Sequence, residues 1–322
     1  MRMPYTAKVY ADTRNMTREE WLESRRHGIG GSDASAILGL NPYVSPLKVY
    51  ADKIGKGKTE ETNEAMRQGT DFEQYVADRF TEETGMKVRK LNRILQHPSY
   101  PWMLANIDRE IPGTNYGLEC KTTSPYSKFK FDEGEINPHY YWQSMHYMAV
   151  TGAVKWYVAV LVLGKSFHVF EIDRDEDAIQ TLIDAEHNFW VNHVLAKDPP
   201  LPTGTDSDDS ALNSLFVQCV SEDNVKDVGE LDSLLDLRQM TIVQRDELEA
   251  EIKEYDQQIK LVMGEHQRGA SASWKVNWTN TVTNKIDTKL LKQKYPDIAA
   301  EVTKSTPGRR FSVSKIKEAD NG

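Results

Sequence analysis

Residues 103–123 read MLANIDREIPGTNYGLECKTT. The alternation on either side of the Pro-Gly-Thr-Asn turn predicts two antiparallel strands joined as a hairpin. Side chains two positions apart in a strand share one face, so Glu119 and Lys121 are expected to project together. Asp108 lies on the preceding strand and can reach the same point. The hairpin therefore predicts a cluster of two carboxylates and one lysine.

Such a cluster suits metal-assisted hydrolysis of a phosphodiester. Paired carboxylates offer the hard oxygen ligands that Mg²⁺ prefers. A bound metal would polarise the phosphate and lower the pKa of a bound water. Lys121 could position that water or offset developing charge. Asp and Glu-x-Lys patterns are also common by chance, so spacing alone leaves a solvated hairpin with scattered charges as the more frequent outcome.

Two predicted helices flank this hairpin in the chain. Gln143 and Tyr147 lie one turn apart on the helix after it, where they could bind a phosphate or a nucleobase. The alternative for Tyr147 is packing into the core. Glu73, on the long helix before the hairpin, either adds a metal-directed carboxylate or is an exposed helix charge.

The run RRHGIGGSD, residues 25–33, places two arginines before a glycine-rich turn and a helix start. Ser32 or Asp33 is the expected N-cap of that helix. Backbone N–H groups and the helix dipole at such a start bind anions. Arg25 and Arg26 favour a phosphate site here, and a simple tight turn is the alternative.

The remaining patterns complete a helix–strand–strand–helix–strand–strand–helix order, which is typical of an α/β or α+β core. The first expected helix lies within residues 17–30, where it runs into the glycine-rich turn. The other expected helices are one through Ala36 to Leu38, one from Pro46 to near Gly55, Glu64 to Thr84, Pro138 to Thr151 and Glu176 to about Leu195. The expected strands are Lys87 to Leu95, Met103 to Ile111, Tyr116 to Thr122, Trp156 to Leu163 and Ser166 to Ile172.

Three prolines at 199, 200 and 202, followed by an acidic loop at 203–210, predict a boundary between domains 1–200 and 205–322. Beyond it we expect a long helix from Asn224 to Glu265, a strand from Ser273 to Thr281, a helix from Lys289 to Tyr295 and a last strand from Arg310 to Ser314. Trp274 and Trp278 alternate on the first of these strands with lysines nearby. They could stack on bases, pack against the long helix, or dock a partner.

The bulk properties narrow the class of protein. Two cysteines among 322 residues exclude a disulfide framework and a four-cysteine metal or iron–sulfur site. The absence of a long apolar run or an export segment predicts no membrane association and a cytoplasmic location. A net charge of -9 argues against a general nucleic-acid coat. A nuclease with a local basic channel stays compatible with it.

The ordered motifs resemble a known family. RRHGIGGSDASAILGLNPY (25–43), GTDFEQYV (69–76), NIDRE with GLECKTT (106–123) and QSMHY (143–147) are similar to the YqaJ-type viral recombinases. The resemblance covers about residues 15–195. It implies the PD-(D/E)XK nuclease fold of phage lambda exonuclease, a central mixed sheet flanked by helices, here with a C-terminal helical and small β extension.

The resemblance also implies an activity, namely 5′→3′ digestion of linear double-stranded DNA that leaves 3′ single strands for recombination by annealing. It implies Mg²⁺, or Mn²⁺, as two ions held by Asp108, Glu119 and the backbone carbonyl of Cys120. The implied partners are DNA ends, a single-strand annealing protein and copies of the chain in a trimeric ring, within the cytoplasm of a bacterium carrying a phage or prophage. The implied catalytic residues are Asp108, Glu119, Lys121, Gln143 and a supporting Glu73, and the implied DNA contacts are Arg25, Arg26, Ser32 and Tyr147.

Two departures weaken parts of this comparison. Ile107 stands where the superfamily pattern has proline, a position that shapes the turn and supplies no ligand. The extension past residue 205 has no counterpart in the lambda-type core. Two alternatives therefore stay open, an endonuclease of the same fold and a catalytically inactive DNA-binding or scaffold protein. The intact Asp108, Glu119 and Lys121 argue against the second.

Overall fold

The computed structural model describes residues 5–57, 63–127, 129–217, 225–305 and 309–316. It divides into two compact units, Met1–Val217 with Phe311–Gly322, and Gln218–Arg310. The predicted boundary at 200–205 stays a prediction. The acidic loop expected at 203–210 is wrong from Asp206 onward, because helix α7 (Asp206–Leu215) begins there. Thr205 caps α7, and three aspartates in the first turn of α7 stabilise it by interacting with the positive end of the helix dipole.

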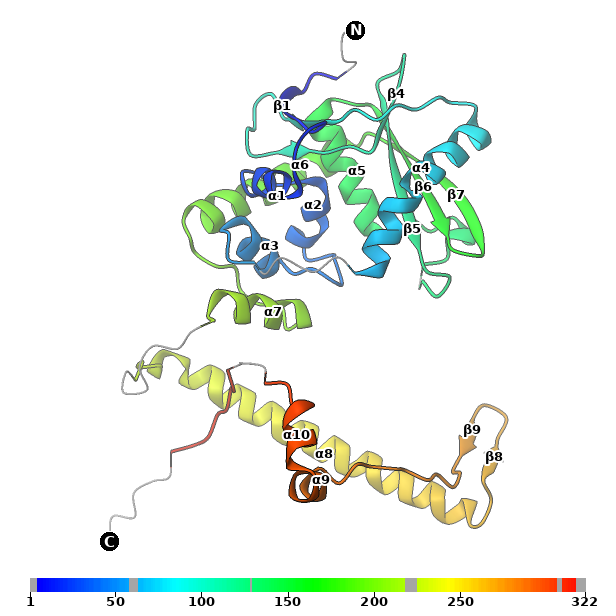
Figure 1. Ribbon diagram of the computed structural model, residues 1–322, viewed down its shortest axis with the longest axis vertical. Helices are drawn as coiled ribbons and strands as arrows, with labels where there is room; N and C mark the ends of the chain where they lie inside the picture. The colour runs from blue at the N-terminus through cyan, green and yellow to red at the C-terminus, as the bar shows by residue number, and fades with distance from the viewer. Residues whose placement is uncertain (1–4, 58–62, 128, 218–224, 306–308, 317–322) are drawn as a thin grey trace. The chain divides into compact units, whose positions relative to one another are not determined.

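The first unit is built around a mixed four-stranded sheet in the order β4 (Arg109–Ile111), β5 (Tyr116–Thr123), β6 (Lys155–Val162), β7 (Ser166–Asp173). Strands β5 and β6 are parallel, and the other neighbours are antiparallel. Helix α5 (Pro138–Thr151) and helix α4 (Glu64–Thr84) lie on opposite faces of this sheet (Figure 1). The arrangement confirms the predicted mixed α/β fold.

Burial on both faces explains the almost continuously apolar sequence of β6. Trp156, Val158 and Val160 belong to the core on the α5 side. Tyr157 and Ala159, at the alternate positions, pack with Val76 and Phe80 of α4. The same alternation on β5 places Leu118 and Cys120 on the α4 side. It therefore turns Glu119 and Lys121 toward α5.

A second, antiparallel sheet has the order β1 (Lys8–Asp12), β2 (Arg93–Gln96), β3 (Leu104–Ala105). Strand β2 is shorter than the expected strand from Lys87 to Leu95. The single strand expected from Met103 to Ile111 is wrong. Its first part, β3, pairs with β2, and its last part, β4, pairs with β5 in the other sheet. Asp108 therefore lies in the break between the two sheets.

Three short helices pack beside this break: α1 (Arg18–Arg26), α2 (Gly31–Ile37) and α3 (Pro46–Lys53). The expected N-cap of α2 at Ser32 or Asp33 is wrong, because Gly30 is the N-cap and Asp33 is the third helical residue. Asp33 instead accepts a hydrogen bond from the Gly30 N–H at 2.9 Å. Helix α6 (Glu176–Phe189) and a π-helix (Trp190–Leu195) follow β7, and a short 3₁₀ turn (Phe131–Glu133) precedes α5.

The second unit starts with a 3₁₀ turn (Gly229–Leu231) and the long helix α8 (Asp232–Met263). Asn224, the expected start of this helix, lies outside the described residues, but an early start is wrong, because residues 225–228 have no regular structure and α8 begins at Asp232. The hairpin β8 (Arg268–Ala270) and β9 (Lys275–Asn277) follows, then α9 (Thr288–Lys294) and α10 (Pro296–Glu301). The strand expected at Arg310 to Ser314 is wrong, since those residues form no regular element. Among the described residues, no helix is both long and apolar enough to cross a membrane.

Candidate active site

Two carboxylates and a lysine meet where the two sheets separate. The Cys120 N–H donates to Asp108 Oδ2 at 2.8 Å, which ties the Asp108 side chain to the backbone of β5. Lys121 Nζ lies 2.7 Å from Glu119 Oε1. Glu119 is only 4% exposed, so its charge is held away from water and must be stabilised by these neighbours. The structure therefore brings together the three residues that the hairpin sequence predicted.

Gln143 of α5 connects this cluster to the break between the sheets. Its Oε1 accepts from Lys121 Nζ at 3.0 Å, while its Nε2 donates to Glu119 Oε1 at 2.7 Å and to the Tyr147 hydroxyl at 2.8 Å. Tyr147 in turn donates to the backbone carbonyl of Asn106 at 3.3 Å. The buried amide thus fixes the positions of both the lysine and the glutamate.

The glycine-rich turn after α1 reaches the same place. The Ile29 N–H donates to the Trp102 carbonyl at 2.7 Å, and the Leu104 N–H donates to the Ile29 carbonyl at 2.8 Å. Gly31 then lies against the ring of Tyr147, where an added Cβ would come within 2.6 Å of Tyr147 Cε1. A residue larger than glycine would push α2 away from α5.

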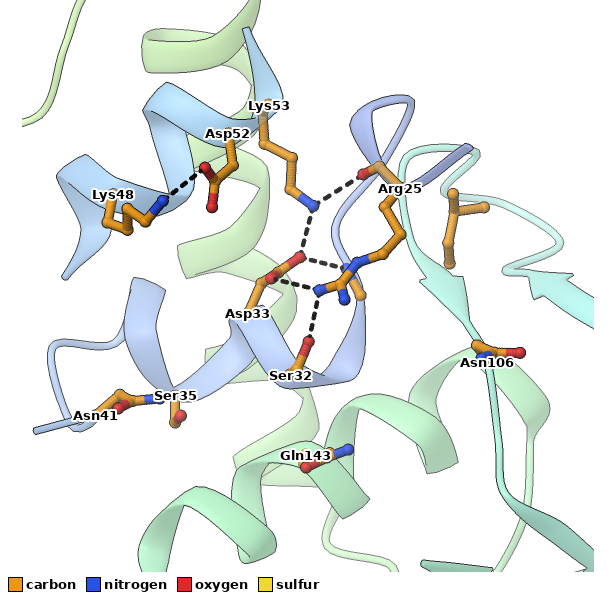
Figure 2. Close-up of polar contacts among 12 residues, drawn as sticks. Arg25, Ser32, Asp33, Ser35, Asn41, Lys48, Asp52, Lys53, Asn106 and Gln143 are labelled. Carbon is orange, nitrogen blue, oxygen red and sulfur yellow. Dashed lines mark hydrogen bonds and ion pairs between the residues drawn. The ribbon is translucent and has the colours of Figure 1, made fainter. Parts of the chain in front are cut away.

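Arg25 forms the cationic side of the site. Its Nη2 donates to Ser32 Oγ at 2.8 Å and lies 3.4 Å from Asp33 Oδ1, as Figure 2 shows. Asp33 is also held by Lys53 Nζ at 2.6 Å. Burial opposes ionisation of Asp33, but the charges of Lys53 and Arg25 outweigh it and lower the Asp33 pKa to about 2. An ionised Asp33 keeps the guanidinium of Arg25 in place.

Several of these groups line one cavity of about 200 Å³. Its polar lining includes Arg25, Ser32, Asn106, Asp108, Glu119 and Gln143. Burial, followed by the charges of Glu119 and Glu73, raises the pKa of Asp108 well above its usual range. Glu119 Oε2 is buried and has no hydrogen-bond partner among the described residues. A cation beside these two carboxylates would stabilise both.

Three predicted site residues lie differently from what the sequence suggested. Glu73 Oε1 is 2.5 Å from Arg109 Nη1 and 3.3 Å from Lys90 Nζ, so its carboxylate is already paired. Arg26 pairs with Glu23 at 2.5 Å, and it is not part of the cavity lining. Tyr147 is 4% exposed and packs in the core, although it also contributes to the cavity lining.

Within the described ranges, no group of three or more His, Cys, Asp or Glu side chains converges on a point that could hold a metal ion. The carboxylates in the cavity lining are those of Asp108 and Glu119. Metal binding by the Cys120 carbonyl stays a prediction.

Lys53, Tyr140 and His146 support the site, and the sequence did not predict these roles. Lys53 lies on α3 among buried apolar residues, and a lysine at such a position is a signal for a buried ion pair. The ring of Tyr140 lies 5.3 Å from Lys121 Nζ. His146 bonds to the Leu104 carbonyl at 2.9 Å and to Glu186 at 2.8 Å, so it supports β3 from behind.

Comparison with known proteins gives matches of two kinds. A family model described as the YqaJ-like viral recombinase domain matches residues 20–154. A protein of Bacillus subtilis (strain 168), named uncharacterized protein YqaJ, is 37% identical over 313 residues, which cover 96% of this chain and 98% of that protein.

Solved structures match a smaller share of the chain at lower identity. The alkaline exonuclease LHK-Exo from Laribacter hongkongensis matches with a TM-score of 0.47 and 21% identity, over 56% of this chain and 94% of that one. A phage-related exonuclease from Haemophilus somnus 129PT matches with a TM-score of 0.41 and 12% identity, over 55% and 99% of the two chains.

Proposed function

The chain belongs to the YqaJ-like viral recombinase family, and from this premise we propose that it is a divalent-metal-dependent exonuclease that digests linear double-stranded DNA from the 5′ end. Membership of this family supports a nuclease function. The observation that carries the proposal is the lining of one cavity by a guanidinium, that of Arg25, and by two carboxylates, those of Asp108 and Glu119. The guanidinium can bind a DNA phosphate, and the two carboxylates can bind the metal that hydrolysis of this phosphate requires.

Asp108 and Glu119, with the Cys120 carbonyl, would hold Mg²⁺ or Mn²⁺, and two ions are part of the proposal. Two observations support this assignment: Glu119 Oε2 has no hydrogen-bond partner among the described residues, and burial with the neighbouring carboxylates raises the pKa of Asp108. Oxygen donors are the ligands that these ions prefer. When bound, the metal would polarise the scissile phosphate and lower the pKa of a bound water.

Lys121 supplies a fixed positive charge next to the metal ligands. Burial lowers its pKa, but the neighbouring carboxylates, Glu119 first, raise it above its usual range overall. The ammonium therefore stays charged at neutral pH and can stabilise negative charge that develops on the phosphate. Gln143 positions Lys121 and Glu119 relative to each other, because it bonds to both.

The test is digestion of end-labelled linear duplex DNA and of covalently closed circular DNA, each with and without Mg²⁺. We expect release of the 5′ label from the linear duplex only when Mg²⁺ is present, and an intact circle. Cleavage of the circle would instead support the endonuclease alternative. Binding of both DNAs without digestion, in Mg²⁺ and in Mn²⁺, would support the inactive scaffold.

Replacing Arg25 by alanine is expected to lower the preference for 5′-phosphorylated over 5′-hydroxyl ends by about tenfold or more, the value of one charge-assisted hydrogen bond. Arg26→Ala is the matched control, because this neighbouring arginine pairs with Glu23 and is not part of the cavity lining. The measurement is the ratio of initial digestion rates on the two kinds of end. Equal effects of the two substitutions would remove Arg25 from the phosphate site.

We also propose two kinds of partner, an annealing protein and further copies of the chain. An exonuclease of this kind leaves a 3′ single strand, which a single-strand annealing protein would take up. Assembly of the chain into a ring, such as a trimer around DNA, and action in the cytoplasm of a bacterial host belong to the same proposal. Sedimentation of the purified protein with and without duplex DNA measures the assembly directly.

A further inference from the structure

The β8–β9 hairpin of the second unit carries two tryptophans on one face. The Ser271 N–H donates to the Trp274 carbonyl at 2.8 Å, and the Trp278 N–H donates to the Gln267 carbonyl at 2.9 Å, so the strand pairing extends past both ends of β9. Because side chains alternate along a strand, Trp274 and Trp278 share the face of Val276.

Only the middle of that face is covered. A Cβ added at Gly269, which pairs with Val276, would come within 2.6 Å of Met263 Sδ at the end of α8, and Met263 is buried. Trp274 and Trp278, on either side, are 77% and 46% exposed. Two large aromatic side chains exposed to solvent on one face of a hairpin are unusual for a surface that binds nothing.

The charge around the hairpin differs from that of the rest of the chain. Residues 268–304 hold seven Lys or Arg and three Asp or Glu, a formal charge of +4, whereas α8 (Asp232–Met263) holds four and eight, a formal charge of -4. The whole chain carries -9. Arg268 and Lys275 lie on the hairpin itself and make no ion pair with any residue that the structure describes. The positive charge is thus concentrated in the segment that carries the exposed indoles, although Lys275, and Arg268 opposite Asn277, project from the other face of the hairpin.

We propose that the β8–β9 hairpin is a second nucleic-acid site that binds single-stranded DNA. Bases stack on Trp274 and Trp278 on one face, and the strand's phosphates pass the edge of the ribbon, where the long side chains of Arg268 and Lys275 reach them from the other face. A single strand fits because its base faces are free, whereas those of a duplex are already stacked, and base–indole stacking tolerates any sequence. The inference rests on the proposed function in one respect, since the exonuclease itself produces the single strand that the hairpin retains.

The experiment measures binding of a labelled oligothymidylate of roughly 16 nucleotides to the full chain by fluorescence anisotropy. EDTA is present, so that no strand is cut. We expect Trp274→Ala with Trp278→Ala to raise the dissociation constant by about tenfold or more. The phenylalanine double variant should retain most of the affinity. An abasic oligomer of the same length should bind wild type and the alanine variant alike, because it offers no base to stack.

Tyr255→Ala is the matched control. Tyr255 is an aromatic residue of α8 that is 51% exposed, among acidic neighbours, and its removal should leave the affinity unchanged. Arg268→Ala with Lys275→Ala should reduce the slope of log affinity against log salt by about 1.4, the value for two phosphate contacts on a single strand. Far-UV circular dichroism of each variant monitors the fold.

An unchanged dissociation constant in the folded alanine variant would overturn the inference. So would a change in sedimentation that assigns the two tryptophans to a contact between protein chains. Digestion of linear duplex by the wild type, measured in parallel, separates the two proposals. Nuclease activity with tryptophan-independent binding overturns only this inference, and tryptophan-dependent binding without nuclease activity overturns only the proposed function.

Discussion

Replacing Glu119 by glutamine is expected to reduce Mg²⁺-dependent hydrolysis of linear duplex DNA by about 10³-fold or more. Loss of a residue that only supports a metal ligand costs about 10- to 100-fold, and loss of a ligand itself should cost more. Glutamine preserves the shape of the side chain and can keep a hydrogen bond to Gln143, so the main change is the lost negative charge. Single-turnover digestion at saturating Mg²⁺ measures the effect.

Two further substitutions serve as a comparison and a control for Glu119→Gln. Asp108→Asn should have an effect of similar size, because Asp108 supplies the other carboxylate of the cavity. Glu73→Gln should cost about tenfold or less, since the Glu73 carboxylate pairs with Arg109 and acts on the site only through its charge. Calorimetric titration with Mn²⁺ measures metal binding independently of turnover. Glu119→Gln should lower the affinity for Mn²⁺. Full activity of Glu119→Gln would remove this residue from the metal site.

The hairpin was predictable because its information is local. The Pro-Gly-Thr-Asn turn fixes which strands pair, and the period of two fixes that Glu119 and Lys121 share a face. The break between β3 and β4 was not predictable in the same way. Residues 103–111 keep a strand-like pattern throughout, and only their separate partners, β2 and β5, reveal that two strands are present.

The sequence also could not predict which of the two arginines at the phosphate site faces the cavity. The sequence places Arg25 and Arg26 side by side and offers no reason to choose between them. Helix α1 separates them, because adjacent residues on a helix point about 100° apart. Arg25 meets Ser32, whereas Arg26 meets Glu23. The approach of this turn to the hairpin depends on the backbone bonds of Ile29 to residues 102 and 104, which no local pattern specifies.

The ion pair between Asp33 and Lys53, which holds Arg25, was not predictable from the sequence either. Asp33 was one of two candidate helix caps, and Lys53, twenty residues later, falls within the helix expected from Pro46 to near Gly55. Their ion pair forms only when α2 and α3 pack together. Charged pairs of this kind leave no periodic signal, so the sequence predicted part of the cavity lining, such as Arg25 and Ser32, and gave no indication of the ion pair that holds Arg25 from behind.

That buried pair leads to the second large expected effect, on stability. Replacing Asp33 by asparagine should destabilise the first unit by about 3–5 kcal/mol, because it leaves the ammonium of Lys53 buried without its counter-charge. The side chains of Lys53 and Asp33 are 4% and 11% exposed, so water cannot replace the lost partner. The midpoint of thermal unfolding should fall by roughly 10 °C at pH 7. Differential scanning calorimetry of the full chain measures this shift.

The pH dependence of this effect has a definite sign. The Asp33 pKa is lowered to about 2, below the value of about 3.9 for an unfolded aspartate, so its contribution is fully present above pH 4 and is lost as the pH falls toward 2. The difference between wild type and Asp33→Asn should therefore shrink by about 2 kcal/mol over that interval. Glu23→Gln is the control, because its pair with Arg26 is exposed and should be worth less than about 1 kcal/mol. A stability difference as small for Asp33→Asn as for Glu23→Gln would mean that Lys53 finds another partner or loses its proton, and Arg25 would then need a different anchor.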